Sequence, residues 1–185
     1  MHNFKIGSVA FIVILFLYLS GCASTPKIGY VSKFPKQEPK NVSIKISNFE
    51  DGRSASEKGK LGGKYNQYEM KIADILEPQD MISSFQQAFI AELENTGYAT
   101  SNGNDLILKG TVQSVSCDLT NGAQTANIKM RLILNDKGRE VLNSIYTGNC
   151  KISYTFDQTG SDAFNAAIRD LVASFVKDLN DYIKT

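Results

Sequence analysis

Histidine is almost absent from this 185-residue chain: the only one is His2, inside a candidate targeting segment. A mature chain without histidine cannot contain a Ser-His-Asp triad, a Cys-His pair or a zinc site with histidine ligands. The patterns GxxxxGK[ST], GxGxxG, HExxH and CxxC are also missing, and these mark phosphate, dinucleotide, metal and redox sites. We therefore expect no cofactor, no metal and no catalytic residue of these classes.

An excess of charge of either sign is absent too. Residues 22–185 hold 19 basic and 19 acidic residues. Proteins that bind nucleic acid usually carry a basic excess, so we expect no nucleic-acid partner. The length predicts a single domain with a sizeable core.

The first 21 residues predict a secretory signal that ends just before Cys22. Residue Lys5 is the only charge before a 14-residue apolar stretch over residues 6–19, which has the length of a signal h-region and is short for a membrane span. The tetrapeptide Leu19-Ser20-Gly21-Cys22 follows. An uncleaved anchor helix and an ordinary signal peptide are the alternatives.

This tetrapeptide resembles the lipobox of bacterial lipoproteins at every position. The resemblance implies that residues 1–21 are a lipoprotein signal peptide and that Cys22 becomes the acylated first residue of the mature chain. Residue 23 is alanine, and in the Gram-negative sorting systems an aspartate there keeps lipoproteins at the inner membrane. The resemblance thus implies an outer-membrane lipoprotein whose domain faces the periplasm.

Residues 22–40 predict a lipidated N-terminus followed by a flexible tether. Residues 23–40 carry three prolines and four lysines without an apolar period. A tether of 18 residues would reach at most about 60 Å. Residues 41–185 are then expected to form one periplasmic domain.

The apolar pattern of residues 41–185 alternates between strand and helix periods. Residues 42–47, 105–117, 125–134 and 141–154 predict strands, with a bulge near Ser114. Residues 78–96 and the segment from Ser161 predict amphipathic helices. We expect an α+β two-layer sandwich: a mainly antiparallel sheet of four or five strands, with both helices packed on one face.

Residues 54–77 have no clean period and contain three glycines. They predict either a mobile functional loop or a glycine-rich excursion with an extra strand near residues 68–76.

The cysteines Cys117 and Cys150 are candidates for a disulfide, because an exported chain meets an oxidising compartment. In the expected meander the middle strand would keep them about 9.6 Å apart, whereas a disulfide needs Cα atoms within roughly 7 Å. Convergence of the outer strands would permit the bond, so both outcomes stay open.

Three segments resemble the YajG-type family of bacterial lipoproteins: "VSIKISNFEDGR", "SFQQAFIAELENTGY" and "NDLILKGTVQSV". That resemblance implies a periplasmic lipoprotein module without defined catalytic residues. The order of elements is also similar to LptE, the lipopolysaccharide-transport lipoprotein, and to LpoB-type activators of cell-wall synthases.

Residues Asp51 and Arg53 form the polar pair that we single out, either as a partner-binding corner of the sheet or as a turn stabilised by Asp51. Two functions follow. The chain is a non-enzymatic binding or scaffolding lipoprotein with a protein partner in the envelope, including an accessory subunit of a transport or cell-wall synthesis machine, or it is a cell-wall hydrolase that uses carboxylates.

Overall fold

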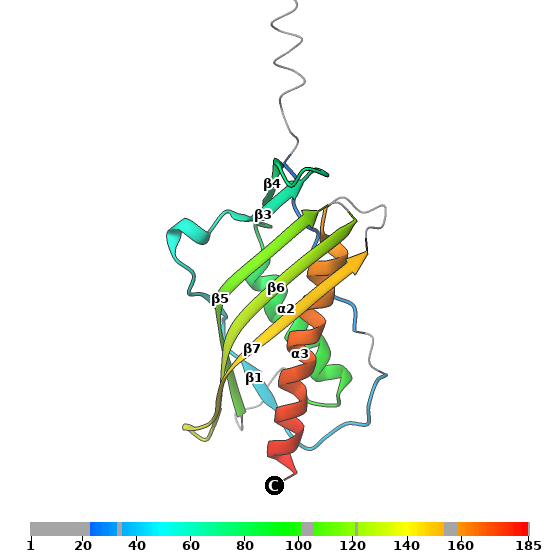
Figure 1. Cartoon of the computed structure of the whole chain (residues 1–185). Helices are drawn as coiled ribbons and strands as arrows, with labels where there is room; N and C mark the ends of the chain where they lie inside the picture. The colour runs from blue at the N-terminus through cyan, green and yellow to red at the C-terminus, as the bar shows by residue number, and fades with distance from the viewer. Residues whose placement is uncertain (1–22, 33–34, 101–105, 121, 154–158, 185) are drawn as a thin grey trace, which may run out of the picture.

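The computed structural model describes residues 23–32, 35–100, 106–120, 122–153 and 159–184 (Figure 1). Cys22 and residues 1–21 lie outside the described residues. The elements are, in order, β1 (Ile44–Ile46), β2 (Glu50–Asp51), a 3-10 turn (Ala55–Glu57), β3 (Lys60–Tyr65), β4 (Lys71–Leu76), α2 (Met81–Asn95), β5 (Leu106–Thr120), β6 (Ala123–Asp136), β7 (Arg139–Ser153) and α3 (Ser161–Ile183).

Three long antiparallel strands, β5, β6 and β7, form the centre of the sheet. The even-numbered residues of β6 from Ala126 to Leu134 are all buried, as the alternating sequence predicts, while Lys129 and Arg131 between them are exposed. The register between β5 and β6 shifts between Val112 and Ser114, which confirms the predicted bulge.

The sheet is larger and more mixed than predicted. In the described residues it has seven strands, because β1, β2 and β3 pair in parallel with successive parts of β5, and β4 pairs with β3. Residues 54–77 thus contain a β-hairpin, which confirms the extra-strand alternative. The α+β class is confirmed, whereas the expected four or five mainly antiparallel strands were too few.

Both helices lie on the same side of the sheet (Figure 1). The longer helix, α3, packs against β6 and β7, and α2 packs beside α3. The ring of Phe85 stacks on Phe164, with centroids 6.0 Å apart, and Phe89 meets Phe175 edge-on at 5.6 Å. A Cβ on Gly148 would come within 1.9 Å of the Ala167 carbonyl oxygen, so this glycine allows α3 to lie directly on β7.

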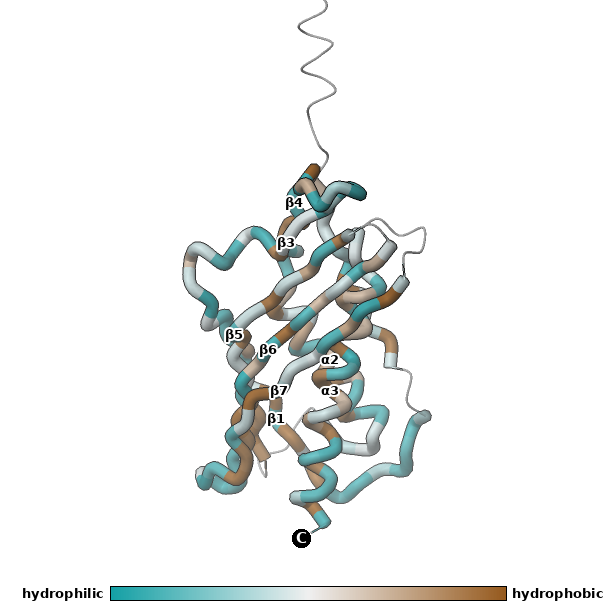
Figure 2. Tube along the Cα trace, viewed as in Figure 1, coloured by the Kyte–Doolittle hydropathy of each residue, from teal (hydrophilic) through white to brown (hydrophobic). Residues whose placement is uncertain are grey.

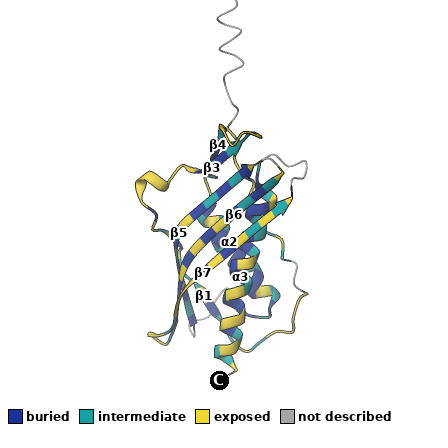
Figure 3. Ribbon diagram, in the orientation of Figure 1, coloured by how far each residue is buried: buried dark blue, intermediate teal, exposed yellow. Residues whose placement is uncertain are grey.

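Hydrophobic and hydrophilic residues alternate along the long strands in Figure 2, and buried and exposed residues alternate along them in Figure 3. Among the described residues, no helix combines the length and the apolar character that crossing a bilayer requires.

The described residues between 23 and 40 lie against the domain, which differs from the expected tether. Tyr30 Oη donates a hydrogen bond to Glu92 of α2 at 2.7 Å, and this bond, with burial as the larger cause, raises the pKa of Tyr30. The Lys40 amide donates to the Gly97 carbonyl, and its ammonium donates to Asn180 of α3, both at 2.7 Å. Hydrogen bonds of this kind leave no periodic pattern in the sequence. A proline-rich segment can therefore pack against the domain although its composition is typical of a linker.

Candidate functional site

Ser24 attaches the start of the described chain to the β3–β4 hairpin. It forms a parallel bridge with Ile75 of β4. Its amide donates to the Asp74 carbonyl at 3.2 Å, and its carbonyl accepts from the Leu76 amide at 2.7 Å. The candidate lipidation residue Cys22 is therefore two positions from a residue that is fixed to β4.

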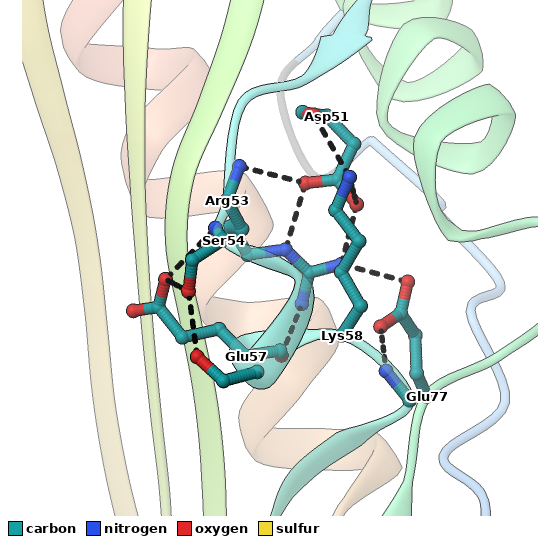
Figure 4. Close-up of polar contacts among 8 residues, drawn as sticks. Asp51, Arg53, Ser54, Glu57, Lys58 and Glu77 are labelled. Carbon is teal, nitrogen blue, oxygen red and sulfur yellow. Dashed lines mark hydrogen bonds and ion pairs between the residues drawn. The ribbon is translucent and has the colours of Figure 1, made fainter.

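Arg53 holds the base of the same hairpin (Figure 4). Its side chain is fully buried and makes two parallel bonds to Asp51, each 2.9 Å long, from Nε and Nη2. Nη2 also donates to Glu77 Oε1 at 2.7 Å. Glu77 follows β4, and its second oxygen accepts from the amide of Gly59, which precedes β3. One guanidinium thus joins β2 to both ends of the hairpin.

The charges of this Arg53 cluster, which we define as Asp51, Arg53 and Glu77, stabilise one another. Hydrogen bonds from Arg53 lower the pKa of Asp51, and the bond to Asp51 raises the pKa of Arg53. The sequence predicted the pair Asp51 and Arg53, and the structure brings them together. Because the Arg53 side chain is buried, the turn interpretation fits its position, and the guanidinium is not presented to a partner.

The tip of the hairpin is a short, ordered turn with exposed apolar side chains. Asn66 Oδ1 accepts the amides of Tyr68 and Met70 at 2.9 and 3.1 Å, and Glu69 takes a positive φ of 60°. The exposed fractions of Tyr68, Met70 and Ile72 are 71%, 57% and 57%. Sequence reasoning missed this cluster, although the alternation of Tyr68, Met70 and Ile72 was a usable signal.

A hollow of about 550 Å³ lies beside the hairpin tip and the ends of β5 and β6. It is lined by Tyr65, Asn66, Gln67, Glu69, Asp118, Thr120 and Thr125. Asp118 Oδ1 accepts the Gly63 amide at 2.9 Å, so this carboxylate helps to hold β3 on β5. Each of these residues carries a hydrogen-bonding side-chain group, and Tyr65 adds an aromatic ring.

The β5–β6–β7 meander has one face that the helices do not cover. The strand register places its side chains in cross-strand rows, for example Thr111, Arg131 and Ile145. We call this surface the open face; it carries four exposed cations, Lys109, Lys129, Arg131 and Lys151. Glu140 lies on the same face, where Asn143 links it to Arg131 through hydrogen bonds. The face is suited to hydrogen bonding, and its exposed charges are mainly positive.

The two remaining cysteines are both thiols and are not joined to each other. Cys117 pairs with Ala126, and Ala126 pairs with Cys150, so β6 separates them. This is the strand register for which we expected the two Cα atoms to be too far apart for a disulfide. Cys117 Sγ contacts the Gly160 carbonyl at 3.8 Å, and burial raises the pKa of Cys150.

The carboxyl groups with displaced pKa values are held ionised by their neighbours. Asp74 has a pKa lowered to about 2 by hydrogen bonds from Lys60 and Lys71. The pKa values of Asp51 and Glu57 are lowered by hydrogen bonds from Arg53 and Ser54. A general acid at neutral pH needs the opposite shift. Within the described residues, no three His, Cys, Asp or Glu side chains gather as a metal site would require.

Comparison with known proteins identifies similar folds but does not assign the chain to a family. No family model and no curated protein matches the chain. A DUF330 protein from Xanthomonas campestris is similar in structure, with a TM-score of 0.57 and 14% identity over 89% of this chain and 99% of that one. A hypothetical protein from Chlamydia trachomatis has a TM-score of 0.52 and 7% identity over 78% and 98% of the two chains. At these identities, the similarity extends to the fold alone.

A lipoprotein from Neisseria meningitidis has a TM-score of 0.37 and 11% identity, covering 77% of this chain and 98% of that one; this is too distant to argue from. The resemblance to the YajG type rests on the three quoted segments.

Proposed function

We propose that this chain is a bacterial lipoprotein, anchored by an acylated Cys22 to the outer membrane, whose domain is a non-enzymatic binding module for another protein of the envelope. The observation that carries the proposal is the fixed position of Ser24 on β4. Cleavage before Cys22 would leave every described element intact, and it would place the lipid directly beside the hairpin. The lipobox supplies the chemistry of the anchor.

The state of the carboxyl groups favours a binding function over a catalytic one. Their displaced pKa values are lowered by ion pairs and hydrogen bonds, which suits structural roles and not proton donation. The open face offers regular cross-strand rows of side chains with the four cations Lys109, Lys129, Arg131 and Lys151. We therefore place the contact with the partner on the open face.

The anchor is tested by expressing the full chain in a Gram-negative host with radiolabelled palmitate. We expect the wild type and Cys150→Ser to be labelled and to fractionate with the outer membrane, and Cys22→Ser to be unlabelled and uncleaved. Mass spectrometry of the N-terminal peptide identifies the acyl groups. If Cys22→Ala is trimmed at the same place and stays with membranes after a carbonate wash, the lipoprotein proposal is wrong.

The binding surface is tested with a photo-crosslinking amino acid in living cells. The matched positions are Ile145 on the open face, which is 51% exposed, and Lys177 on the exposed side of α3. We expect a discrete adduct at Ile145, weakened by Arg131→Glu, and none at Lys177. A transport or cell-wall synthesis subunit in the adduct would identify an LptE-like or LpoB-like accessory role.

The competing function, a carboxylate-based cell-wall hydrolase, is tested separately by an activity assay. The hollow beside the hairpin contains Glu69 and Asp118, so it is the place to look for such an activity. Release of peptidoglycan fragments by the purified wild type, lost in Glu69→Gln, would refute the non-enzymatic proposal.

A further inference from the structure

The exposed apolar side chains of the domain are concentrated at one point. In the described ranges, five large hydrophobic residues are more than half exposed: Val31, Tyr68, Met70, Ile72 and Ile145. Three of the five fall within five consecutive residues at the β3–β4 hairpin. Single exposed apolar residues are normal on a protein surface, whereas a cluster marks a contact.

The hairpin is built to keep this cluster in place. The Asn66 side chain closes the turn through the amides of Tyr68 and Met70. The base is fixed by the buried Arg53, which bonds to Glu77. Because both ends of the hairpin are held, its exposed apolar side chains are a feature of the folded state and not of a frayed loop.

The cluster lies beside the point where the chain would leave the membrane. Two residues span at most about 7 Å, so the Cα atom of Cys22 stays within that distance of Ser24. Ser24 is bridged to Ile75, and Ile72 lies three residues earlier in β4, about 10 Å away. Figure 1 shows β3 and β4 at the end of the molecule where the described chain begins, and the C-terminus at the opposite end.

We propose that the tip of the β3–β4 hairpin inserts Tyr68, Met70 and Ile72 into the headgroup region of the same bilayer that holds the lipid on Cys22. This inference rests on the proposed lipoprotein function. A tyrosine ring suits the boundary between headgroups and acyl chains, and methionine and isoleucine suit the acyl side.

Two lysines of the hairpin, Lys71 close to the tip and Lys60 at the base, can lie at the membrane surface, and Glu69 at the tip is exposed. Lys60 and Lys71 of the hairpin have side chains that are 63% and 43% exposed, and both pair with Asp74. Their long apolar stems can lie along the membrane surface while the ammonium groups stay paired with Asp74 at headgroup level. With the lipid and the hairpin both in the interface, the domain has two attachment points and a fixed orientation in which α3 ends away from the membrane.

The chain contains no tryptophan, so a single tryptophan gives an optical probe without background. We would purify the full lipidated chain carrying Tyr68→Trp and reconstitute it in phosphatidylethanolamine–phosphatidylglycerol vesicles with brominated acyl chains. The matched control is Ile145→Trp, which is similarly exposed but lies on the open face. Mass spectrometry of each preparation determines whether Cys22 is acylated, and circular dichroism verifies the fold.

We expect the Tyr68→Trp emission to shift to the blue and to lose intensity in brominated vesicles, with the indole within about 5–10 Å of the headgroup–acyl boundary. The Ile145→Trp emission stays unchanged. Adding Met70→Ser and Ile72→Ser to Tyr68→Trp reduces the quenching, because two of the three inserted side chains become polar.

Three results would overturn the inference. Acylated protein in which Tyr68→Trp is quenched no more than Ile145→Trp refutes hairpin insertion and leaves the lipoprotein proposal standing. Protection of Tyr68→Trp from acrylamide without quenching by brominated lipid identifies a protein contact and also refutes insertion. Protein that is not acylated at Cys22 refutes the proposed function, and the hairpin inference falls with it.

Discussion

Arg53→Met is the substitution for which the structure gives the clearest expectation. The variant removes a fully buried guanidinium from two carboxylates and leaves Asp51 and Glu77 without their main cation. Breaking a buried ion pair from one side costs about 3–5 kcal/mol. Because the side chains of Asp51 and Glu77 are 18% and 17% exposed, water can solvate the remaining carboxylates, and we expect about 2–3 kcal/mol.

The loss is measured by unfolding in urea, since guanidinium chloride would screen the ion pairs. It corresponds to a fall in Tm of about 5–10 °C for a chain of this size. Arg53→Lys keeps the charge but not the two parallel bonds to Asp51, so we expect an intermediate loss of about 1–2 kcal/mol. Hydrogen exchange should rise at the amide of Gly59 more than at the amides of β6.

Lys58→Met is the matched control. Lys58 also pairs with Asp51, at 3.6 Å, but its side chain is 43% exposed, so its removal should cost less than about 1 kcal/mol. If Arg53→Met and Lys58→Met change the free energy of unfolding equally, the Arg53 cluster does not hold the hairpin as we describe.

Three further predictions follow from packing, thiol chemistry and charge. Gly148→Ala should lower the stability by about 2 kcal/mol or more in a thermal melt, since the new Cβ meets the backbone of α3, whereas Gly29→Ala, with nothing within 4 Å of its Cβ, should be close to neutral. Cys117 and Cys150 should both titrate as thiols in denaturant, and a reductant should leave the Tm unchanged; a mass two protons lower without reductant would contradict the register across β6. The destabilisation by Asp74→Asn should be present above about pH 4 and vanish as the pH falls toward about 2, because the folded-state pKa of Asp74 is lowered to about 2 from 3.8; a pH-independent difference in urea midpoints would show that its lysine pairs do not contribute.

The long strands and the helices could be predicted because each carries its own period. The alternation from Ala126 to Leu134 predicted which side of β6 is buried, and the phase change after Val112 predicted the bulge in β5. These features depend on neighbours in sequence, which a pattern records directly.

The parallel pairings and the docked N-terminal residues could not be predicted, because they depend on backbone groups that every residue has. Ser24 binds β4 through its amide and carbonyl, and no side-chain type signals that. The buried state of Arg53 was equally hidden: Asp51 was visible two positions away, but Glu77 lies 24 residues further along the chain.

The backbone bonds of Ser24 also decide how the domain would respond to a mechanical pull on its lipid. Tension along residues 22–24 would act first on the two hydrogen bonds of Ser24 to β4. It would then act on those of Lys27, Gly29 and Tyr30 to the two helices, and only afterwards on those of Lys40. Peeling the chain from Ser24 to Lys40 would lengthen the connection by up to about 55 Å, while the sheet and both helices stay folded. The docked segment is thus a length of chain that a pulling force, and not thermal motion, would release.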